Sequence, residues 1–252
     1  MYLFEYQELI KNLVISDLKI KYSNSVLGFA WSILNPLLMM LVLFFVFGNV
    51  FQNQDNFIGY LLTGLLAWRF FSMGTTFAMN SIVSKSNLVT KIYIRREILT
   101  ISVVISSLIS SLIEFLVLIP LLIILGMGLS GTFLLFPFIH LIFFIIIYGT
   151  GLILASLFVY YRDMNQIWEL ILQVGFFLSP IFYPISYIPN KYLFYYNLNP
   201  ITLLIKMYRA IILDGALPKM SDMIYVFMIG LVVLFMGTIL FKKLSKRFAE
   251  VI

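Results

Sequence analysis

The chain has 252 residues, of which 62% are hydrophobic and 11% are charged, and its formal net charge is +6. Soluble domains carry about 25% charged residues, so this composition excludes an ordinary water-soluble fold and indicates a membrane protein. The chain has no cysteine and a single histidine, His140, which excludes disulfides, thiolate metal sites and multi-histidine metal sites.

The first 22 residues, 1–22, carry an amphipathic pattern and precede the first long apolar stretch. Apolar side chains recur with helical spacing from Tyr2 to Val14, until Asp17 interrupts the stripe. We predict a helix that lies along the inner leaflet of the membrane. An arm that packs on another subunit is the alternative, and the periodicity does not separate the two. The charged residues in this stretch are not typical of a removable signal peptide.

Six apolar stretches then approach or exceed the roughly 20 residues that an α-helix needs to cross the hydrocarbon core. We therefore predict an all-α, polytopic membrane protein in which residues 1–252 form a single transmembrane domain. Three of the links are very short, so the helices that they join are expected to be antiparallel neighbours. The predicted spans are residues 33–51, 57–82, 98–126, 133–159, 164–183 and 223–241.

The link between the second and third spans, residues 84–97, contains a short helical pattern. Asn87 can cap a helix that has an apolar side flanked by basic residues. A solvated charged turn does not need an apolar side, so we predict a helix that docks on a cytoplasmic partner. Contact with the lipid surface is the alternative. The apolar side consists of Leu88, Val89, Ile92 and Tyr93.

The segment between the last two spans, residues 184–222, is too long for a turn and has too many prolines to cross the membrane. Asn199 and Pro200 supply an N-cap and a first-turn proline, and Gly215 can end the helix that they begin. We predict a short amphipathic helix over residues 200–213 at the outer mouth of the protein.

The positions of lysine and arginine predict the orientation. If both termini are cytoplasmic, most of the 17 basic residues lie on the cytoplasmic side, and the two short outer links contain none. The basic residues lie at the ends of apolar stretches. This placement favours membrane topology, and not a nucleic-acid partner, as the reason for the positive net charge. We predict cytoplasmic N- and C-termini.

Two ionisable residues, Arg69 and Glu114, lie near the middle of the second and third spans. A charged side chain at that depth costs about 2.5–3.5 kcal/mol on insertion scales. The two spans form a hairpin, which brings both residues to a similar depth, so we predict an intramembrane ion pair. We favour a role in helix packing, and a direct role in transport is the alternative.

Motifs for energised chemistry are missing from the chain. The sequence contains no G-x-x-x-x-G-K-[ST] phosphate loop, no H-E-x-x-H and no G-x-S-x-G. If the protein does energised work, the energy has to come from another polypeptide or from an ion gradient. A membrane-embedded transferase would need a cluster of carboxylates or histidines at one membrane face, and the spans offer only scattered ionisable residues.

Five groups of residues occur in a fixed order along the chain: DLKIKY at 17–22 with SVLGFAW at 25–31 and LNPLL at 34–38, KIYIRREI at 91–98, YRD at 161–163, FLSPIFYP at 177–184, and LNPI at 198–201 with Arg209. Together they resemble ABC-2 type permeases that export cell-surface polysaccharides. The resemblance covers essentially the whole chain.

The resemblance implies a homodimeric channel joined to two copies of a separate ATPase subunit. ATP and Mg²⁺ would bind to that partner, so this chain would carry no cofactor and no catalytic residues. The link at residues 84–97 would hold the coupling helix that transmits closure of the ATPase. The candidate coupling residues are Leu88, Val89, Lys91, Ile92, Tyr93, Arg95, Arg96 and Glu97.

In similar exporters the pore runs along the dimer axis, close to the first and fifth spans. The resemblance therefore implies that aromatic residues on these spans line it, and residues 200–213 would belong to an outer gate. Flat aromatic faces can stack on sugar rings, which suits a polymer that slides past them. The lining candidates are Phe47, Phe51, Trp168, Phe176 and Tyr183. Arg69 matches no motif of the family.

The function that the resemblance implies is export of lipid-linked O-antigen polysaccharide across the bacterial inner membrane. Export of teichoic acid or capsule polysaccharide is one alternative, and an ABC-2 exporter of drugs or small lipids is another. The expected partners are the ATPase, a second copy of the chain, the lipid-linked polymer and membrane lipid.

Overall fold

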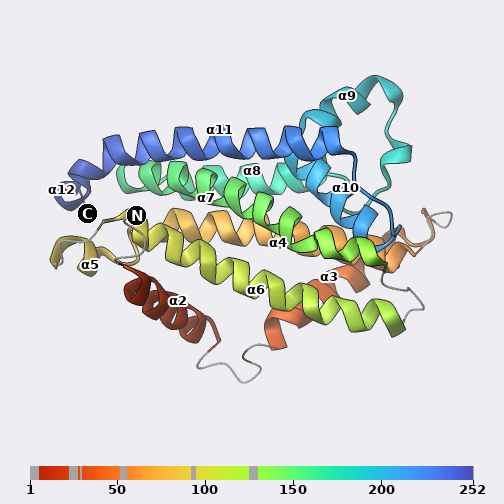
Figure 1. Ribbon diagram of the computed structural model, residues 1–252, viewed down its shortest axis with the longest axis horizontal. Helices are drawn as coiled ribbons and strands as arrows, with labels where there is room; N and C mark the ends of the chain where they lie inside the picture. The colour runs from red at the N-terminus through yellow and green to blue at the C-terminus, as the bar shows by residue number, and fades with distance from the viewer. Residues whose placement is uncertain are drawn as a thin grey trace.

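The computed structural model describes residues 6–22, 28, 30–51, 56–91, 95–124 and 130–251. These residues are predominantly helical and contain no strand, which confirms the predicted all-α class. Among them, five helices are long and apolar enough to cross a membrane. These are α3 (Ala30–Phe47), α4 (Phe57–Asn80), α6 (Glu97–Ile124), α7 (Phe136–Tyr160) and α11 (Met220–Leu244), arranged as a bundle in Figure 1.

Shorter helices lie at the two ends of this bundle and along its side. We call the end that holds α5 and α12 the α5 end, and the opposite end, which holds α9 and α10, the α10 end (Figure 1). The shorter helices are α2 (Gln7–Tyr22), α5 (Ser86–Lys91), α8 (Met164–Leu178), α9 (Asn190–Leu198), α10 (Pro200–Ile212) and α12 (Phe248–Val251), with 3-10 turns η1 (Gly131–Leu135), η2 (Ile185–Tyr187) and η3 (Ser245–Arg247).

The fifth predicted span, residues 164–183, is shorter in the structure than in the prediction. α8 ends at Leu178, because Ser179 is extended and is followed by Pro180, which disfavours a helical conformation of the residue before it. The 15 residues of α8 reach about 22 Å at about 1.5 Å each, which is less than the roughly 30 Å of the hydrocarbon core. Five of the six predicted spans are therefore helices of full spanning length.

α8 nevertheless returns the chain from one end of the bundle to the other. Just before α7, the Thr132 hydroxyl donates to the carbonyl of Ile211 in α10. At the far end of α7, the Tyr160 hydroxyl donates to the carbonyl of Leu244 in α11. α7 and α11 thus run in the same direction, and α8 provides the return between them (Figure 1).

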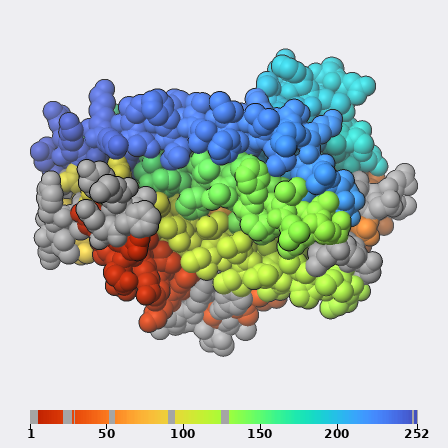
Figure 2. All heavy atoms as spheres, viewed as in Figure 1, coloured from red at the N-terminus to blue at the C-terminus, as the bar shows by residue number. Residues whose placement is uncertain are grey.

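The predicted N-terminal amphipathic helix is present as α2, and it packs against α6 of the same chain (Figure 2). Val14 is buried in this contact, and the helix continues through Asp17 to Tyr22, the predicted end of the helix. The Asp17 carboxylate lies 2.8 Å from Nζ of Lys85, in the link between α4 and α5. This ion pair gives Asp17 a structural role that the apolar periodicity did not reveal.

The predicted amphipathic helix near the outer mouth is present as α10, with the expected ends. The Asn199 side chain accepts a hydrogen bond from the amide of Ile201, and Pro200 occupies the first turn. Gly215 follows the helix with φ of +61°, in the left-handed region that favours glycine. Unlike a surface helix, α10 is buried along most of its length, between α4 and α7.

Two glycines allow α7 and α11 to approach closely. A Cβ atom on Gly149 would lie 2.6 Å from the amide nitrogen of Leu234, and one on Gly237 would collide with the carbonyl oxygen of Gly149. Such contacts involve backbone on both sides, so the helices cannot relieve them by rotating a side chain. The two helices therefore need glycine at both positions to keep their observed separation.

We expect Gly149→Ala to lower the free energy of unfolding by about 2–3 kcal/mol, because the added methyl group forces α7 away from α11. Thermal unfolding of the purified protein in detergent measures the effect. Gly131→Ala is the matched control, since a Cβ atom there would meet nothing within 4 Å. Equal stability of the two variants would contradict the close helix contact.

Candidate functional site

α8 is held against the bundle along one narrow stripe, and most of its surface is exposed. Trp168 is the one buried residue of the helix, and its Nε1 donates to the hydroxyl of Thr75 in α4 at 3.2 Å. The exposed part includes three polar side chains spaced three and four residues apart, which places them on one face. They are Gln166, Glu169 and Gln173. A polar face on a helix that lies within a bundle of apolar spans indicates contact with water or with other polar groups.

The structure brings four of the five predicted lining residues together at the α10 end. Ring centroids are 5.0 Å apart for Phe47 and Phe182, and 5.9 Å apart for Phe176 and Phe182. Phe51 stacks near Phe47 and meets the edge of Tyr187. This cluster joins the end of α3 to the segment that follows α8.

Tyr183 is the fourth predicted lining residue in this cluster, and Trp168 is the one that lies outside it. Tyr183 extends the cluster toward α9, because its hydroxyl lies 3.0 Å from that of Tyr196 and donates to the carbonyl of Phe177. Trp168 lies apart from the cluster, buried against α4 with 8% of its surface exposed. In a single copy of the chain its side chain therefore faces the bundle and not the exposed side of α8.

Arg209 of α10 clamps the segment after α8 onto α4. Its Nη1 donates to the carbonyl of Pro180, and its Nη2 donates to the carbonyls of Ile181 and Tyr60, at 2.6, 2.8 and 3.1 Å. The guanidinium carbon also lies 3.3 Å from the centroid of the Tyr60 ring. Burial lowers the pKa of Arg209 to about 10, so the side chain keeps its charge at neutral pH. The clamp fixes the far end of α8.

The structural role of Arg209 was not part of the sequence prediction, although a signal for it exists. Arg209 follows Ile205 by four residues and precedes Ile212 by three, so it sits at the edge of the apolar face of α10. A charged residue at such a position is costly to bury unless its hydrogen bonds are satisfied. The three carbonyls meet that requirement for Nη1 and Nη2, whereas Nε is buried without a partner among the described residues.

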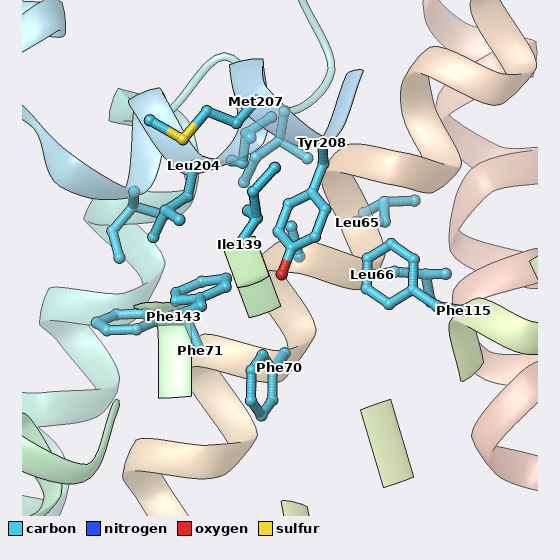
Figure 3. Close-up of a cluster of buried hydrophobic side chains, with 14 of the residues drawn as sticks. Leu65, Leu66, Phe70, Phe71, Phe115, Ile139, Phe143, Leu204, Met207 and Tyr208 are labelled. Carbon is cyan, nitrogen blue, oxygen red and sulfur yellow. The ribbon is translucent and has the colours of Figure 1, made fainter. Parts of the chain in front are cut away.

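Next to Arg209, Tyr208 points from α10 into the middle of the bundle, between Phe143 of α7 and Phe115 of α6 (Figure 3). Its hydroxyl lies 2.7 Å from Nδ1 of His140, and His140 stacks on Phe70 of α4. The single histidine is thus a buried packing residue that ties α7 to α10. Together with Arg209, this contact makes α10 an integral part of the core.

The predicted pairing of Arg69 with Glu114 is present in the structure. Nε of Arg69 lies 3.1 Å from Oε1 of Glu114, and the two side chains are 19% and 4% exposed. One turn earlier on α6, the Ser110 hydroxyl accepts a hydrogen bond from Nζ of Lys21 in α2. These polar contacts link α2, α4 and α6 on the side of the bundle away from α8, so the ion pair lies apart from the polar face of α8.

The predicted coupling segment lies at the α5 end. α5 begins at Ser86, one residue before the predicted cap Asn87, and ends at Lys91. Val89 is buried and Leu88 is half-buried, as an apolar side requires. Ile92 and Tyr93 lie outside the described residues, so the structure does not place them. Of the remaining candidates, Arg95 and Arg96 precede α6, and Glu97 is the first residue of that helix.

A bundle of apolar helices with a polar face on one short helix is typical of a membrane-embedded transport protein. Comparison with protein families gives the same class, since the family model of the ABC-2 type transporter matches residues 8–213. The chain belongs to the ABC-2 type transporter family.

Curated relatives resemble the chain over its whole length. An O-antigen export system permease protein RfbA of Klebsiella pneumoniae is 30% identical over 100% of this chain and 96% of its own length. The RfbA of Myxococcus xanthus is 32% identical over 98% of this chain and 96% of its own. The polysialic acid transport protein KpsM of Escherichia coli is 26% identical, and the match covers 95% of each chain.

Proposed function

We propose that the chain is the transmembrane subunit of an ATP-driven exporter that moves lipid-linked O-antigen polysaccharide to the outer face of the bacterial inner membrane. Two relatives with about 30% identity are named as O-antigen export permeases, and both are matched nearly end to end. The observation on this chain that carries the proposal is the polar face of α8, formed by Gln166, Glu169 and Gln173.

The polar face of α8 favours a conduit that a second copy of the chain completes. Side chains of this kind face a water-filled cavity or another polar group when they lie within a membrane, because lipid cannot satisfy their hydrogen bonds. α3 also exposes a broad apolar face, which includes Leu41, Val42 and Phe45. A homodimer that brings α3 and α8 of both copies around one axis would cover these surfaces and enclose the polar face.

Aromatic residues at the α10 end suit a saccharide cargo. Phe47, Phe51, Phe176 and Tyr183 form a connected group with Phe182 near the end of the proposed conduit. Flat rings can stack on sugar rings through weak contacts, which permit the polymer to move on. In this proposal α10 and α9 form the outer gate, and the α5 end with both termini is cytoplasmic.

ATP hydrolysis belongs to a separate subunit in this proposal, because the chain contains no phosphate loop. Two ATPase subunits, which bind ATP and Mg²⁺, would dock on α5 and the residues that follow it. Export of capsule polysaccharide is a second candidate, and the similarity to the capsule polysaccharide export inner-membrane protein CtrC of Neisseria meningitidis, 22% identical over 95% of the chain, supports it.

We expect a cysteine in place of Gln173 to be accessible to water in the assembled transporter. The chain has no cysteine, so single cysteines can be added without removing any. Gln173→Cys should react with a membrane-impermeant maleimide at least about ten times faster than Val232→Cys on the exposed side of α11, because a thiol in lipid does not ionise. Equally slow labelling at both positions would rule out a conduit along α8.

Reconstitution tests the function directly. Purified chain and ATPase are incorporated into proteoliposomes with lipid-linked O-antigen on one side, and transfer to the other side is measured by a lectin that recognises the polymer. Transfer that requires ATP and both polypeptides supports the proposal. ATP hydrolysis by the purified chain alone would contradict the division of labour, and transfer of capsule polymer but not O-antigen would favour the second candidate.

A further inference from the structure

The α5 end has a hydrophobic cluster of its own, separate from the core in the middle of the bundle. Its centre includes Phe248 of α12, whose side chain is completely buried. The buried members are Ile82, Val89, Leu99, Leu152, Ala155, Val159, Phe241 and Phe248. These residues come from α5, the helix that the proposed function assigns to coupling, and from α6, α7, α11, α12 and the link before α5.

Phe248 touches several of these elements at once. Its ring centroid lies 5.5 Å from that of Phe241 in α11 and 6.1 Å from that of Tyr160 in α7, both nearly edge to face. The Arg96 guanidinium, just before α6, lies 5.7 Å from the same ring. α12 also contacts α5 directly. One aromatic side chain therefore connects the coupling region to two spanning helices.

The rest of α12 does not explain why this short helix lies against the bundle. Glu250 and Val251 are exposed, so of the α12 residues whose side chains the structure describes Phe248 is the buried one. A four-residue helix has no stability of its own, and it stays ordered only because tertiary contacts hold it. The η3 turn helps to fix the approach, since the residue before it, Leu244, accepts the hydrogen bond from Tyr160.

The cluster also leaves out the helices of the proposed conduit. Among the described residues, none of its members belongs to α3 or α8, the helices that the proposed conduit would use. α7 and α11 are packed together along their whole length, at the separation that Gly149 and Gly237 allow. α5 shares the cluster with α7 and α11, whereas α8 contacts α4 and α7 and has no member in it among the described residues.

We propose that Phe248 is a positioning residue that locks α5 to α7 and α11, so that movement of α5 is passed to the spanning helices. The inference rests on the proposed function, in which α5 receives the movement of an ATPase. Without the ring, α12 loses its aromatic contacts with α7 and α11, and the cluster that contains Val89 of α5 loses a fully buried member. α5 would then move without the bundle, and ATP hydrolysis would be separated from transport.

Distance measurements between spin labels test the lock without any transport assay. Labels are placed on Asn87→Cys in α5 and Lys242→Cys in α11, both exposed positions in a chain with no cysteine of its own. We expect a narrow distance distribution in the parent protein, loss of that narrow peak in Phe248→Ala, and its recovery in Phe248→Leu. Val251→Ala is the matched control in the same helix and should leave the distribution unchanged.

The reconstituted exporter gives the second measurement. Phe248→Ala is expected to bind the ATPase and to hydrolyse ATP, while polymer moved per ATP falls by about tenfold, within the usual range of coupling between sites. Phe248→Leu should restore most of the polymer moved per ATP. A smaller amount of folded transporter would lower transport and ATP hydrolysis together, so it would leave this ratio unchanged. If the alanine variant does not fold, Phe248→Val gives a smaller cavity for the same comparison.

Two results would overturn the inference. One is an unchanged distance distribution in a folded Phe248→Ala, whatever its transport activity. The other is a broadened distribution with unchanged polymer moved per ATP, which would show that the lock does not transmit movement. Failure of the proposed function looks different, because the parent protein would then move no polymer while its spin-label distances stayed narrow.

Discussion

Replacing Arg209 with alanine is expected to lower the free energy of unfolding by about 4 kcal/mol or more, because each buried carbonyl left without a donor costs about 1–3 kcal/mol. Two carbonyls, of Pro180 and Ile181, lose the Arg209 donor, and the carbonyl of Tyr60 keeps only its bond within α4. Arg209→Lys should recover little of the loss, since one ammonium cannot reproduce a planar fork with several partners. Thermal unfolding in detergent measures the effect.

A second variant tests the same clamp from the other side. A Cβ atom on Gly64 would lie 2.6 Å from Nη2 of Arg209 and 2.9 Å from the carbonyl oxygen of Ile181, so Gly64→Ala should displace the clamp at a cost of about 1–3 kcal/mol. Lys206→Ala on the same helix is the control, because the Lys206 ammonium bonds an exposed side chain. If Arg209→Ala were no less stable than Lys206→Ala, the clamp would be refuted.

Removing one partner of the Arg69–Glu114 pair is expected to lower the free energy of unfolding by about 3–5 kcal/mol, because the other charge stays buried and unpaired. Replacing both residues with leucine should restore much of the stability, since neither charge is then left in an apolar surrounding. We therefore expect strongly non-additive effects, with a coupling energy of about 1–3 kcal/mol in a double-mutant cycle.

The same four proteins separate packing from transport. If the pair only fixes the packing of α4 against α6, the Arg69→Leu and Glu114→Leu double variant should export polymer at close to the parent rate once it is folded. Additive losses of stability would mean that the 3.1 Å contact contributes nothing to the folded state. A folded double variant that does not export would assign the pair a direct role in transport.

Helices were predictable where one physical requirement dominated the sequence. Long apolar runs have to be helical in lipid, because only helices satisfy every backbone hydrogen bond internally, and all five long helices follow such runs. The ends of α10 were predictable because Asn199, Pro200 and Gly215 act locally. The early end of α8 shows the limit of hydropathy, since Pro180 stops the helix inside an apolar run.

Contacts between distant residues were predictable only where chemistry demanded a partner. Two charges at one depth in lipid, Arg69 and Glu114, leave few options, and the structure pairs them. The clamp of Arg209 uses backbone carbonyls, which every sequence offers, so no residue type marks its partners. The burial of Trp168 against Thr75 depends on how α8 is rotated about its axis. In a single copy of the chain both polar and apolar residues of α8 are exposed, so the sequence pattern of the helix does not predict that rotation.

The short length and polar face of α8 also bear on how the chain is inserted into the membrane. Fifteen residues with Glu169 and two glutamines give a weak insertion signal, whereas α7 has 25 residues without a charge. We therefore expect α8 to enter lipid as the second arm of a hairpin with α7. Its far end is held by Arg209, which is synthesised later, so we expect α8 to be held in place only when α10 has left the ribosome and folded onto α4.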